Sequence, residues 1–189
     1  MKRETEMMIF FGRVVMEGGL VMGSSGNMSM KKGNRIYITR TGAMLGYLSE
    51  DDIIDVGLNP KKSEMAIASK ELKLHLLIYE WRKCGAVLHT HPSYTLAVSG
   101  NKKFIKPLDL EGRVLAPEIP AISLSYPYKD EELNERLKPL LKKYPYFVVR
   151  WHGLFATGDN LEEAVKISFT IESSSKLLFL LSEMRRLDL

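Results

Sequence analysis

The sequence predicts a single α+β or three-layer domain that spans residues 1–189. Helical and strand-like segments are mixed along the chain without strict βαβ alternation, and no internal repeat divides it. No linker or low-complexity tract is present, and 189 residues are enough to bury a substantial core.

The first part of the chain begins with a predicted helix and continues into short strands. Residues 4–17 carry apolar side chains at mixed helical spacing and end at a glycine pair, as helices do. Residues 23–29 are small or polar and predict a loop. Residues 35–39 alternate as in a strand, and a serine cap with acidic residues predicts a helix start at 48–52. Residues 53–56 predict another strand.

The clearest helix is expected at residues 69–84, where Ser69 is the predicted cap and a Cys-Gly pair the end. A strand at residues 86–91 follows, and Pro92 terminates it. Residues 93–99 then predict a short helix.

The last part of the chain ends in a long helix. Residues 104–128 contain prolines and short β-like runs, and residues 130–143 predict an exposed, charged helix. A compact strand is expected at residues 146–152, with residues 153–158 as its turn. An Asp-Asn pair then caps an amphipathic helix that runs from residue 160 to about residue 186.

The composition favours a soluble, cytoplasmic protein that acts on small molecules. No apolar run reaches the length of a membrane span, and no signal-peptide cleavage site follows the basic N-terminus. Cys84 is the only cysteine, which excludes an intrachain disulfide and fits a reducing compartment. The formal net charge is +4, but the lysines occur as scattered pairs. We therefore expect no membrane or nucleic-acid partner and allow for small anionic substrates.

His89 and His91 are two of the chain's four histidines and lie two positions apart on a predicted strand. Residues i and i+2 of a strand project from the same face, so both imidazoles can converge on one metal ion. The alternative is a polar strand edge whose histidines bind backbone carbonyls. The pair alone leaves both interpretations open.

His152 is the candidate for a third ligand. It follows the mostly buried run at residues 147–151, and connections after strands often carry functional residues. A structural histidine is the alternative. Three neutral imidazoles without a fourth histidine or cysteine ligand would match a catalytic zinc that keeps one position open for substrate.

Glu71 is the candidate acid/base. It lies in the first turn of the predicted helix upstream of the histidine pair, and an antiparallel helix would bring it near the strand end. The alternative is a surface acid that interacts with the helix dipole. His75 lies one turn later and either orients Glu71 or is simply packed in the core.

Two polar turns and Ser69 predict an anion pocket. Residues 26–29 and 39–42 offer backbone N–H groups together with short hydroxyl and amide side chains. No Gly-Lys-Ser/Thr follows either turn, so neither is a nucleotide-binding P-loop. Each segment taken alone is most often just a turn.

Five motifs in order are Gly26-Asn27-x-Ser29, Thr39-Arg40-Thr41-Gly42, Ser69-Lys70-Glu71-x3-His75, His89-Thr90-His91-Pro92 and His152-Gly153. In this order and at these separations they resemble the class II aldolase/adducin family, most closely its fuculose-1-phosphate aldolase branch. The resemblance runs from about residue 7 to residue 175.

The resemblance implies a three-layer αβα sandwich around a mainly antiparallel central sheet, commonly assembled as a homotetramer. It implies one Zn²⁺ ion per subunit, bound by His89, His91 and His152, with Glu71 as the acid/base. It also implies a substrate-phosphate site, formed by the residues Asn27, Thr41, Gly42 and Ser69.

Two departures from the family pattern concern the substrate. Lys70 stands where the aldolase pattern has a second serine, and it either contacts the phosphate or signals a different substrate. The proton-donating tyrosine of the family is hard to align, and Tyr126 and Tyr128 are the candidates.

The resemblance implies reversible cleavage of a ketose 1-phosphate, such as fuculose 1-phosphate, to dihydroxyacetone phosphate and an aldehyde through an enediolate. The alternatives within the family are a methylthioribulose-1-phosphate dehydratase and a pentulose-phosphate 4-epimerase, although epimerases tend to have aspartate in place of Glu71. A non-catalytic adducin-like interaction module is the alternative outside enzymology, and the three histidines argue against it.

Overall fold

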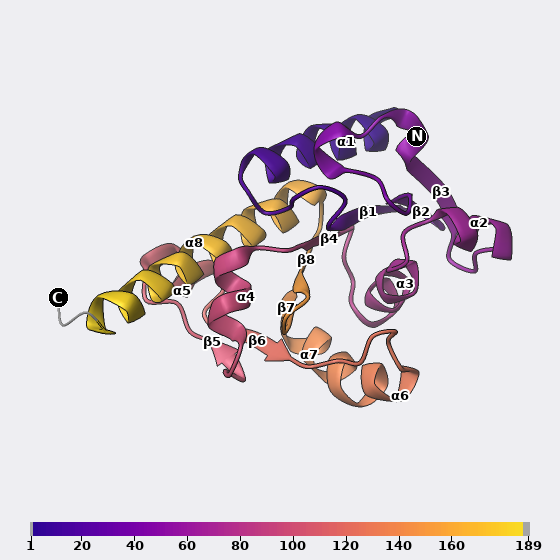
Figure 1. The fold of residues 1–189 in the computed structure, drawn as a ribbon. Coiled ribbons are helices and arrows are strands. Elements are labelled where there is room, and N and C mark those ends of the chain that lie inside the picture. Colours follow the sequence, from indigo (N-terminus) through magenta and orange to yellow (C-terminus); the bar gives the residue numbers. More distant parts are fainter. Residues whose placement is uncertain (1, 187–189) are drawn as a thin grey trace.

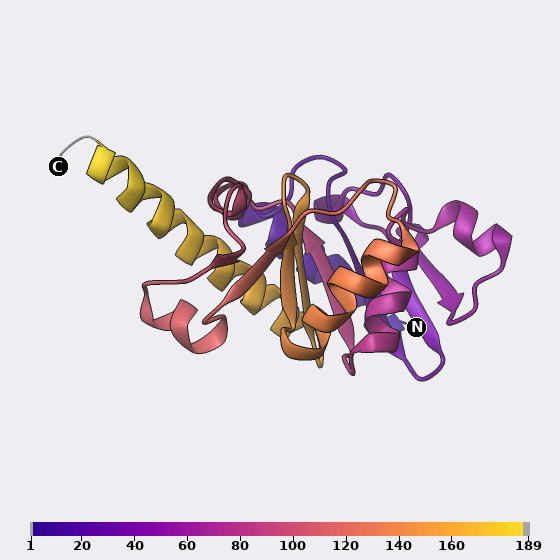
Figure 2. The ribbon, with the colours of Figure 1, turned by 90° about the horizontal axis from the view of Figure 1, so that it is seen from below.

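The computed structural model describes residues 2–186 and contains one eight-stranded sheet with helices on both faces (Figures 1 and 2). The strands are β1 (Asn27–Lys32), β2 (Arg35–Thr39), β3 (Ile53–Gly57), β4 (Ala86–Thr90), β5 (Phe104–Ile105), β6 (Ile119–Ile122), β7 (Tyr146–Val149) and β8 (Gly153–Gly158). The α-helices are α1 (Lys2–Glu17), α2 (Lys62–Ile67), α3 (Leu72–Trp81), α4 (Ser93–Ser99), α5 (Leu110–Leu115), α6 (Asp130–Glu132), α7 (Lys138–Lys143) and α8 (Leu161–Arg186). Three shorter helical turns are η1 (Leu45–Tyr47), η2 (Glu50–Asp52) and η3 (Leu133–Leu137).

The sheet has the order β3-β2-β1-β4-β8-β7-β6-β5, so β4 lies in its interior. Among the described residues, every pairing of neighbouring strands is antiparallel except that of β6 with β7. The predicted three-layer fold around a mainly antiparallel sheet is therefore confirmed.

Two hydrophobic clusters cover the two faces of the sheet. Ala86 and Leu88 of β4 belong to the cluster beneath α1 and α8, whereas Val87 belongs to the cluster beneath α3 and α7. This division follows from the two-residue period of a strand, which sends successive side chains to opposite faces. Each fully buried leucine, isoleucine or phenylalanine contributes about 1.5–3 kcal/mol to folding. The interior strands are thus held from both sides.

The helices and strands with a regular apolar pattern were predicted correctly. The N-terminal helix, the strand at 35–39, the helix at 93–99 and the long C-terminal helix are all present. The Asn160 side chain accepts the Glu163 N–H at 3.0 Å and caps α8 as expected.

The prediction of a turn at residues 153–158 is wrong, because this segment is strand β8. Leu154 and Phe155 are fully buried on opposite faces, and β8 pairs with both β4 and β7. Gly153 and Gly158, which suggested a turn, are the first and last residues of this strand. Neighbouring backbone and side-chain atoms approach both glycines closely. The actual turn follows Val149, where β7 ends, and includes Trp151 with a φ of 61°.

Other element boundaries also differ from the prediction. The helix expected at 69–84 begins at Leu72 and ends at Trp81, and the strand expected at 86–91 ends at Thr90. The second half of the loop expected at 23–29 is the start of β1.

The helix start expected at 48–52 is a single short turn, η2, and the segment at 130–143 includes the wider turn η3. That segment is less exposed than expected, because Leu133, Leu137 and Leu141 are fully buried. Helices α2 and α5 were not predicted.

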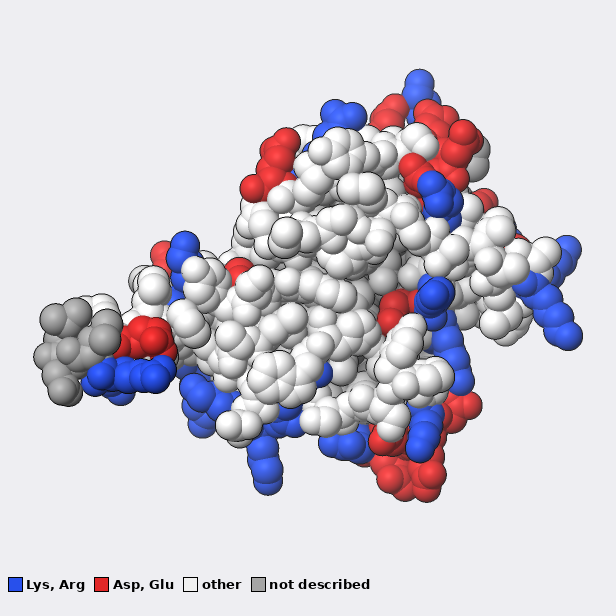
Figure 3. All heavy atoms as spheres, viewed as in Figure 1, with Lys and Arg blue, Asp and Glu red and all other residues white. Residues whose placement is uncertain are grey.

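None of the helices within residues 2–186 is long and apolar enough to cross a membrane. Charged side chains gather around the edge of the face drawn in Figure 3, and most of its centre is uncharged. This face has no continuous basic surface among the residues described.

Candidate active site

All nine predicted site residues line one hollow of about 300 Å³, namely Asn27, Thr41, Gly42, Ser69, Lys70, Glu71, His89, His91 and His152. The hollow lies where β1 begins and where β2, β4 and β7 end, so several connections meet there. Further lining residues include Ser24, Ser25, Ala43 and Tyr126. The two serines belong to the small-residue loop found in the sequence, but nothing marked them individually.

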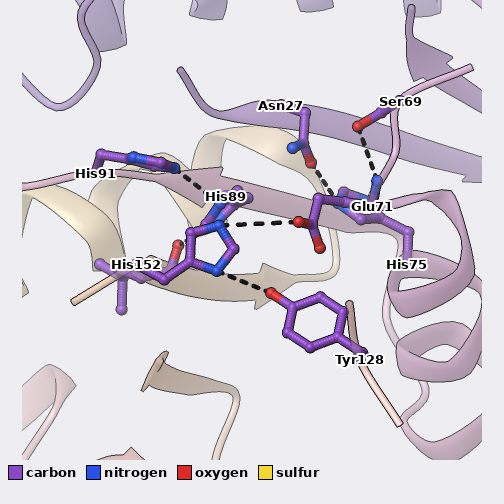
Figure 4. A network of polar contacts seen from close by, with 9 residues as sticks. Asn27, Ser69, Glu71, His75, His89, His91, Tyr128 and His152 are labelled. Atoms are coloured by element: carbon purple, nitrogen blue, oxygen red, sulfur yellow. Dashed lines mark hydrogen bonds and ion pairs between the residues drawn. The ribbon is translucent and has the colours of Figure 1, made fainter. Parts of the chain in front are cut away.

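The three candidate metal ligands converge (Figure 4). His89 is in β4, His91 follows the end of β4, and His152 is in the turn between β7 and β8. Their potential ligand atoms all lie within 4.8 Å of one another, and the Nε2 atoms of His89 and His91 are 3.0 Å apart. Nδ1 of His89 is 3.1 Å from the Leu154 carbonyl oxygen, to which it can donate, and this leaves Nε2 for a metal.

The surroundings of the three imidazoles favour their neutral form. Burial lowers the pKa of His89, and the nearby His91 and His152 lower it further. Burial likewise lowers the pKa of His91 to about 4 and lowers that of His152. Neutral imidazoles have the free lone pair that a metal ion requires, so this group could hold one.

Glu71 lies beside this group and is almost completely buried, with 6% of its surface exposed. Its Oε1 atom is 3.8 Å from Nε2 of His152 (Figure 4). Burial raises the pKa of Glu71 to about 7, and interaction with the Tyr128 hydroxyl opposes the rise. The carboxyl group is therefore poised to gain or lose a proton near neutral pH. Glu71 precedes α3 as its N-cap residue and does not lie in its first turn as predicted.

His75 is a packed histidine and does not orient the Glu71 carboxylate. It is fully buried, and burial lowers its pKa to about 3, so it is neutral. Its ring nitrogens lie 2.7 Å from Asn27 Oδ1 and 2.7 Å from Ser29 Oγ. Because Asn27 Oδ1 can only accept, His75 Nε2 donates to it, and the Asn27 amide NH₂ remains available to the hollow.

The same hollow also offers donors for an anion. Gly42 has a φ of 74°, the left-handed conformation that favours glycine, and follows Thr41 at the end of β2. Ser69 Oγ accepts the Glu71 N–H at 3.2 Å, which leaves the serine hydroxyl proton free. Lys70 is exposed at the rim and adds a positive charge.

Two tyrosines approach His152 from the segment after β6. The Tyr128 hydroxyl is 2.9 Å from Nδ1 of His152, and the two rings stack at an interplanar angle of 29°. The Tyr126 ring meets the His152 ring edge-on, with centroids 5.9 Å apart, but Tyr126 is 64% exposed. Of the two candidates named from the sequence, Tyr128 is thus the one hydrogen-bonded to a site residue.

Comparison with known proteins identifies the family of this chain. The family described as Class II Aldolase and Adducin N-terminal domain matches residues 6–179, which is most of the chain. The chain belongs to this family. The class II aldolase relatives include an L-fuculose phosphate aldolase from Methanococcus maripaludis (strain C7), 31% identical over 87% of this chain and 90% of the relative.

Other members of the class II aldolase family are similar over nearly the whole chain. A solved L-fuculose-1-phosphate aldolase from Thermus thermophilus superimposes with a TM-score of 0.88 at 25% identity, covering 98% of this chain and 97% of that one. A 3-oxo-tetronate 4-phosphate decarboxylase from Pectobacterium atrosepticum is 29% identical over 97% of this chain and 87% of the relative. The family therefore includes relatives that act on different substrates.

Proposed function

We propose that the chain is a zinc-dependent aldolase that reversibly cleaves a ketose 1-phosphate to dihydroxyacetone phosphate and an aldehyde. The observation that carries the proposal is the buried Glu71 carboxylate beside three converging imidazoles, with N–H and hydroxyl donors in the same hollow. The relatives named as fuculose phosphate aldolases support it.

His89, His91 and His152 are the residues that would hold the zinc ion. Their potential ligand atoms are close enough together, and burial favours the neutral rings that zinc requires. Among the described residues, no cysteine or further histidine joins this group, which fits a catalytic zinc with a position open for substrate. When bound, Zn²⁺ supplies Lewis-acid polarisation of the substrate carbonyl and stabilises the negative charge that develops on its oxygen.

Glu71 is proposed to move the proton. In synthesis its carboxylate removes a proton from the hydroxyl-bearing carbon of dihydroxyacetone phosphate, the resulting enediolate attacks the aldehyde, and the alkoxide that forms takes up a proton from solvent. In cleavage the substrate hydroxyl gives its proton to solvent as the carbon–carbon bond breaks, and the protonated Glu71 returns its own proton to the carbon of the enediolate. A pKa raised to about 7 makes both protonation states accessible near neutral pH.

The phosphate is proposed to bind in the same hollow as the histidines. Asn27, Thr41, Gly42 and Ser69 offer neutral donors there, and Lys70 offers a charge at the rim. Holding the phosphate fixes the position of the reacting carbon relative to Glu71, and this positioning is itself a contribution to rate.

A 3-oxo-tetronate 4-phosphate decarboxylase is the second candidate, because a relative with that name covers 97% of this chain. Loss of the carboxyl carbon from this β-keto acid leaves the enediolate of dihydroxyacetone phosphate, which one proton completes. The same metal site, Glu71 and phosphate donors therefore serve either bond cleavage. The two activities differ in the group that leaves, which is an aldehyde in one reaction and CO₂ in the other.

The deciding experiment uses purified full-length protein, loaded with Zn²⁺, and each substrate in turn. Release of dihydroxyacetone phosphate from L-fuculose 1-phosphate together with an equal amount of aldehyde supports the aldolase. Release of CO₂ from 3-oxo-tetronate 4-phosphate, without aldol cleavage, supports the decarboxylase. Assays with methylthioribulose 1-phosphate and a pentulose 5-phosphate test the dehydratase and epimerase. A chain that binds no divalent metal and acts on none of these substrates would instead be an adducin-like module.

The assembly is proposed to be a homotetramer, by resemblance to the family. Four large apolar side chains on one stretch of α8 are solvent-exposed in the single chain, namely Leu177, Leu180, Leu181 and Met184. Burial of such a stripe against another subunit would be favourable. Light scattering coupled to size-exclusion chromatography gives the mass of the particle in solution and tests this state against a monomer of 21.5 kDa.

A further inference from the structure

We propose that Tyr128 is a positioning residue whose hydroxyl accepts a hydrogen bond from His152 and fixes the orientation of that imidazole. The inference rests on the proposed function, because it takes His152 as a metal ligand. It assigns a role to Tyr128, which belongs to neither the proposed metal site nor the proposed phosphate site.

The two ring nitrogens of His152 have different neighbours. Nε2 is directed toward His89 and Glu71, and Nδ1 lies 2.9 Å from the Tyr128 hydroxyl (Figure 4). A metal ion on Nε2 requires its lone pair, so the ring proton must be on Nδ1. Nδ1–H then donates to Tyr128, and the phenolic oxygen accepts.

The segment that carries Tyr128 is fixed at its base. The Glu132 carboxylate accepts the Ser125 N–H at 2.8 Å and the Ser125 hydroxyl at 3.0 Å, which ties the two ends of the segment together. The Tyr128 side chain is half-buried and stacks on the His152 ring. The Tyr128 hydroxyl is thus held beside His152 before substrate binds.

Tyr128 is the hydrogen-bond partner of His152 at Nδ1, the ring nitrogen that would not bind the metal. Because this partner is a side chain, mutation can remove it. The corresponding partner of His89 is the backbone carbonyl of Leu154, which survives any side-chain substitution. Loss of such an outer hydrogen bond typically costs about 10–100-fold in metal affinity or activity.

The test compares Tyr128→Phe with Tyr126→Phe in the full-length protein. Both changes remove one hydroxyl and keep the ring beside His152, but only Tyr128 is hydrogen-bonded to that histidine. Zn²⁺ affinity is measured by competition with a chelator, and kcat and KM are measured with the substrate found active. We expect Tyr128→Phe to weaken Zn²⁺ binding about 10-fold and, with saturating Zn²⁺, to lower kcat about 10-fold with KM nearly unchanged. Tyr126→Phe should leave Zn²⁺ affinity within about twofold of the parent.

The parent protein separates failure of this inference from failure of the proposed function. If the parent binds Zn²⁺ and Tyr128→Phe binds it equally well with the same kcat, the positioning role is overturned and the metal site stands. A KM increase in place of a kcat decrease would also overturn it, because Tyr128 would then bind substrate. If the parent itself binds no Zn²⁺, both proposals fall. Unchanged thermal melting of metal-free Tyr128→Phe verifies that the variant is folded.

Discussion

Gly153 lies directly against the imidazole of His89, and a Cβ atom added at Gly153 would stand 2.3 Å from Cε1 of that ring. The ring has little room to retreat, because Phe155 stacks on it with centroids 3.9 Å apart. The absence of a side chain in the first residue of β8 therefore determines where a candidate metal ligand stands in β4.

Gly153→Ala should displace the His89 ring and damage the metal site. Overpacking of this kind costs about 1–3 kcal/mol of folding stability, and we expect Zn²⁺ affinity to fall by at least about 10-fold. Calorimetric titration and thermal unfolding measure the two effects. Gly57→Ala is the matched control, since a Cβ there meets nothing closer than 3.5 Å and the φ is not positive. Equal Zn²⁺ affinity in the two variants would contradict the prediction.

Glu71→Gln should abolish proton transfer and leave the metal site filled. The amide keeps the shape of the carboxyl group but cannot exchange a proton, so kcat should fall about 10²–10⁴-fold. Metal content measured by atomic emission should equal that of the parent. Retention of full activity would assign the acid/base role to another group. Glu64→Gln provides the control, because that carboxylate lies outside the hollow.

Lys70→Ser restores the residue type of the aldolase pattern and tests the charge at the rim. If Lys70 binds the substrate phosphate, KM should rise about 10-fold, the loss expected for one charge-assisted hydrogen bond, with little change in kcat. The effect should shrink at high salt, because the lysine is exposed. Lys73→Ser is the control on the same segment, since Lys73 pairs with Asp130 and does not line the hollow. No change in KM would show that Lys70 serves another purpose.

Asp52→Asn should destabilise the fold in a pH-dependent way. Hydrogen bonds from Ser49 and the pairing with Arg40 at 2.6 Å hold the pKa of Asp52 below its ordinary value of 3.8. A lowered folded-state pKa stabilises the protein above the unfolded-state pKa, and this contribution disappears as the pH falls through the folded-state value. At pH 7 the loss should be about 1 kcal/mol, as for other helix caps.

Urea unfolding of this variant and of the parent at several pH values checks the prediction. The difference should persist above about pH 5 and narrow progressively below pH 3.8. Asp51→Asn, an exposed neighbour in the same turn, should show less than about 0.5 kcal/mol at any pH. A difference for Asp52→Asn that widens toward acid pH would contradict the assignment.

The sequence was most informative where one periodicity governed a whole element. Alternation marked β2, and a glycine pair marked the end of α1, because both signals are local. Strand β8 was missed because burial on both faces and flanking glycines remove the alternation that identifies a strand. This segment is a strand because it pairs with β4 and β7, which are distant in the sequence. A local sequence pattern does not report those pairings.

In the candidate site, too, features with a local sequence signal were predictable, and features that depend on distant segments were not. The strand period correctly suggested that His89 and His91 would converge, even though His91 lies just beyond the end of β4. The role of His75 was left open, because only the fold places Asn27 and Ser29 against its two nitrogens. Tyr128 could be named as a candidate but not given a partner, since its contact with His152 joins segments that no sequence spacing relates.

The hollow combines one candidate metal ligand from an interior strand, His89, with residues from the loops that connect strands and helices. His89 lies in an interior strand and pairs in register with Asn27 and Phe155, so a one-residue slip of β4 would turn its side chain to the other face. Lys70 and Tyr126 lie outside the strands and helices. A library intended to change substrate preference should therefore randomise these two positions, because variants there can be sampled widely while the metal-binding framework is inherited unchanged.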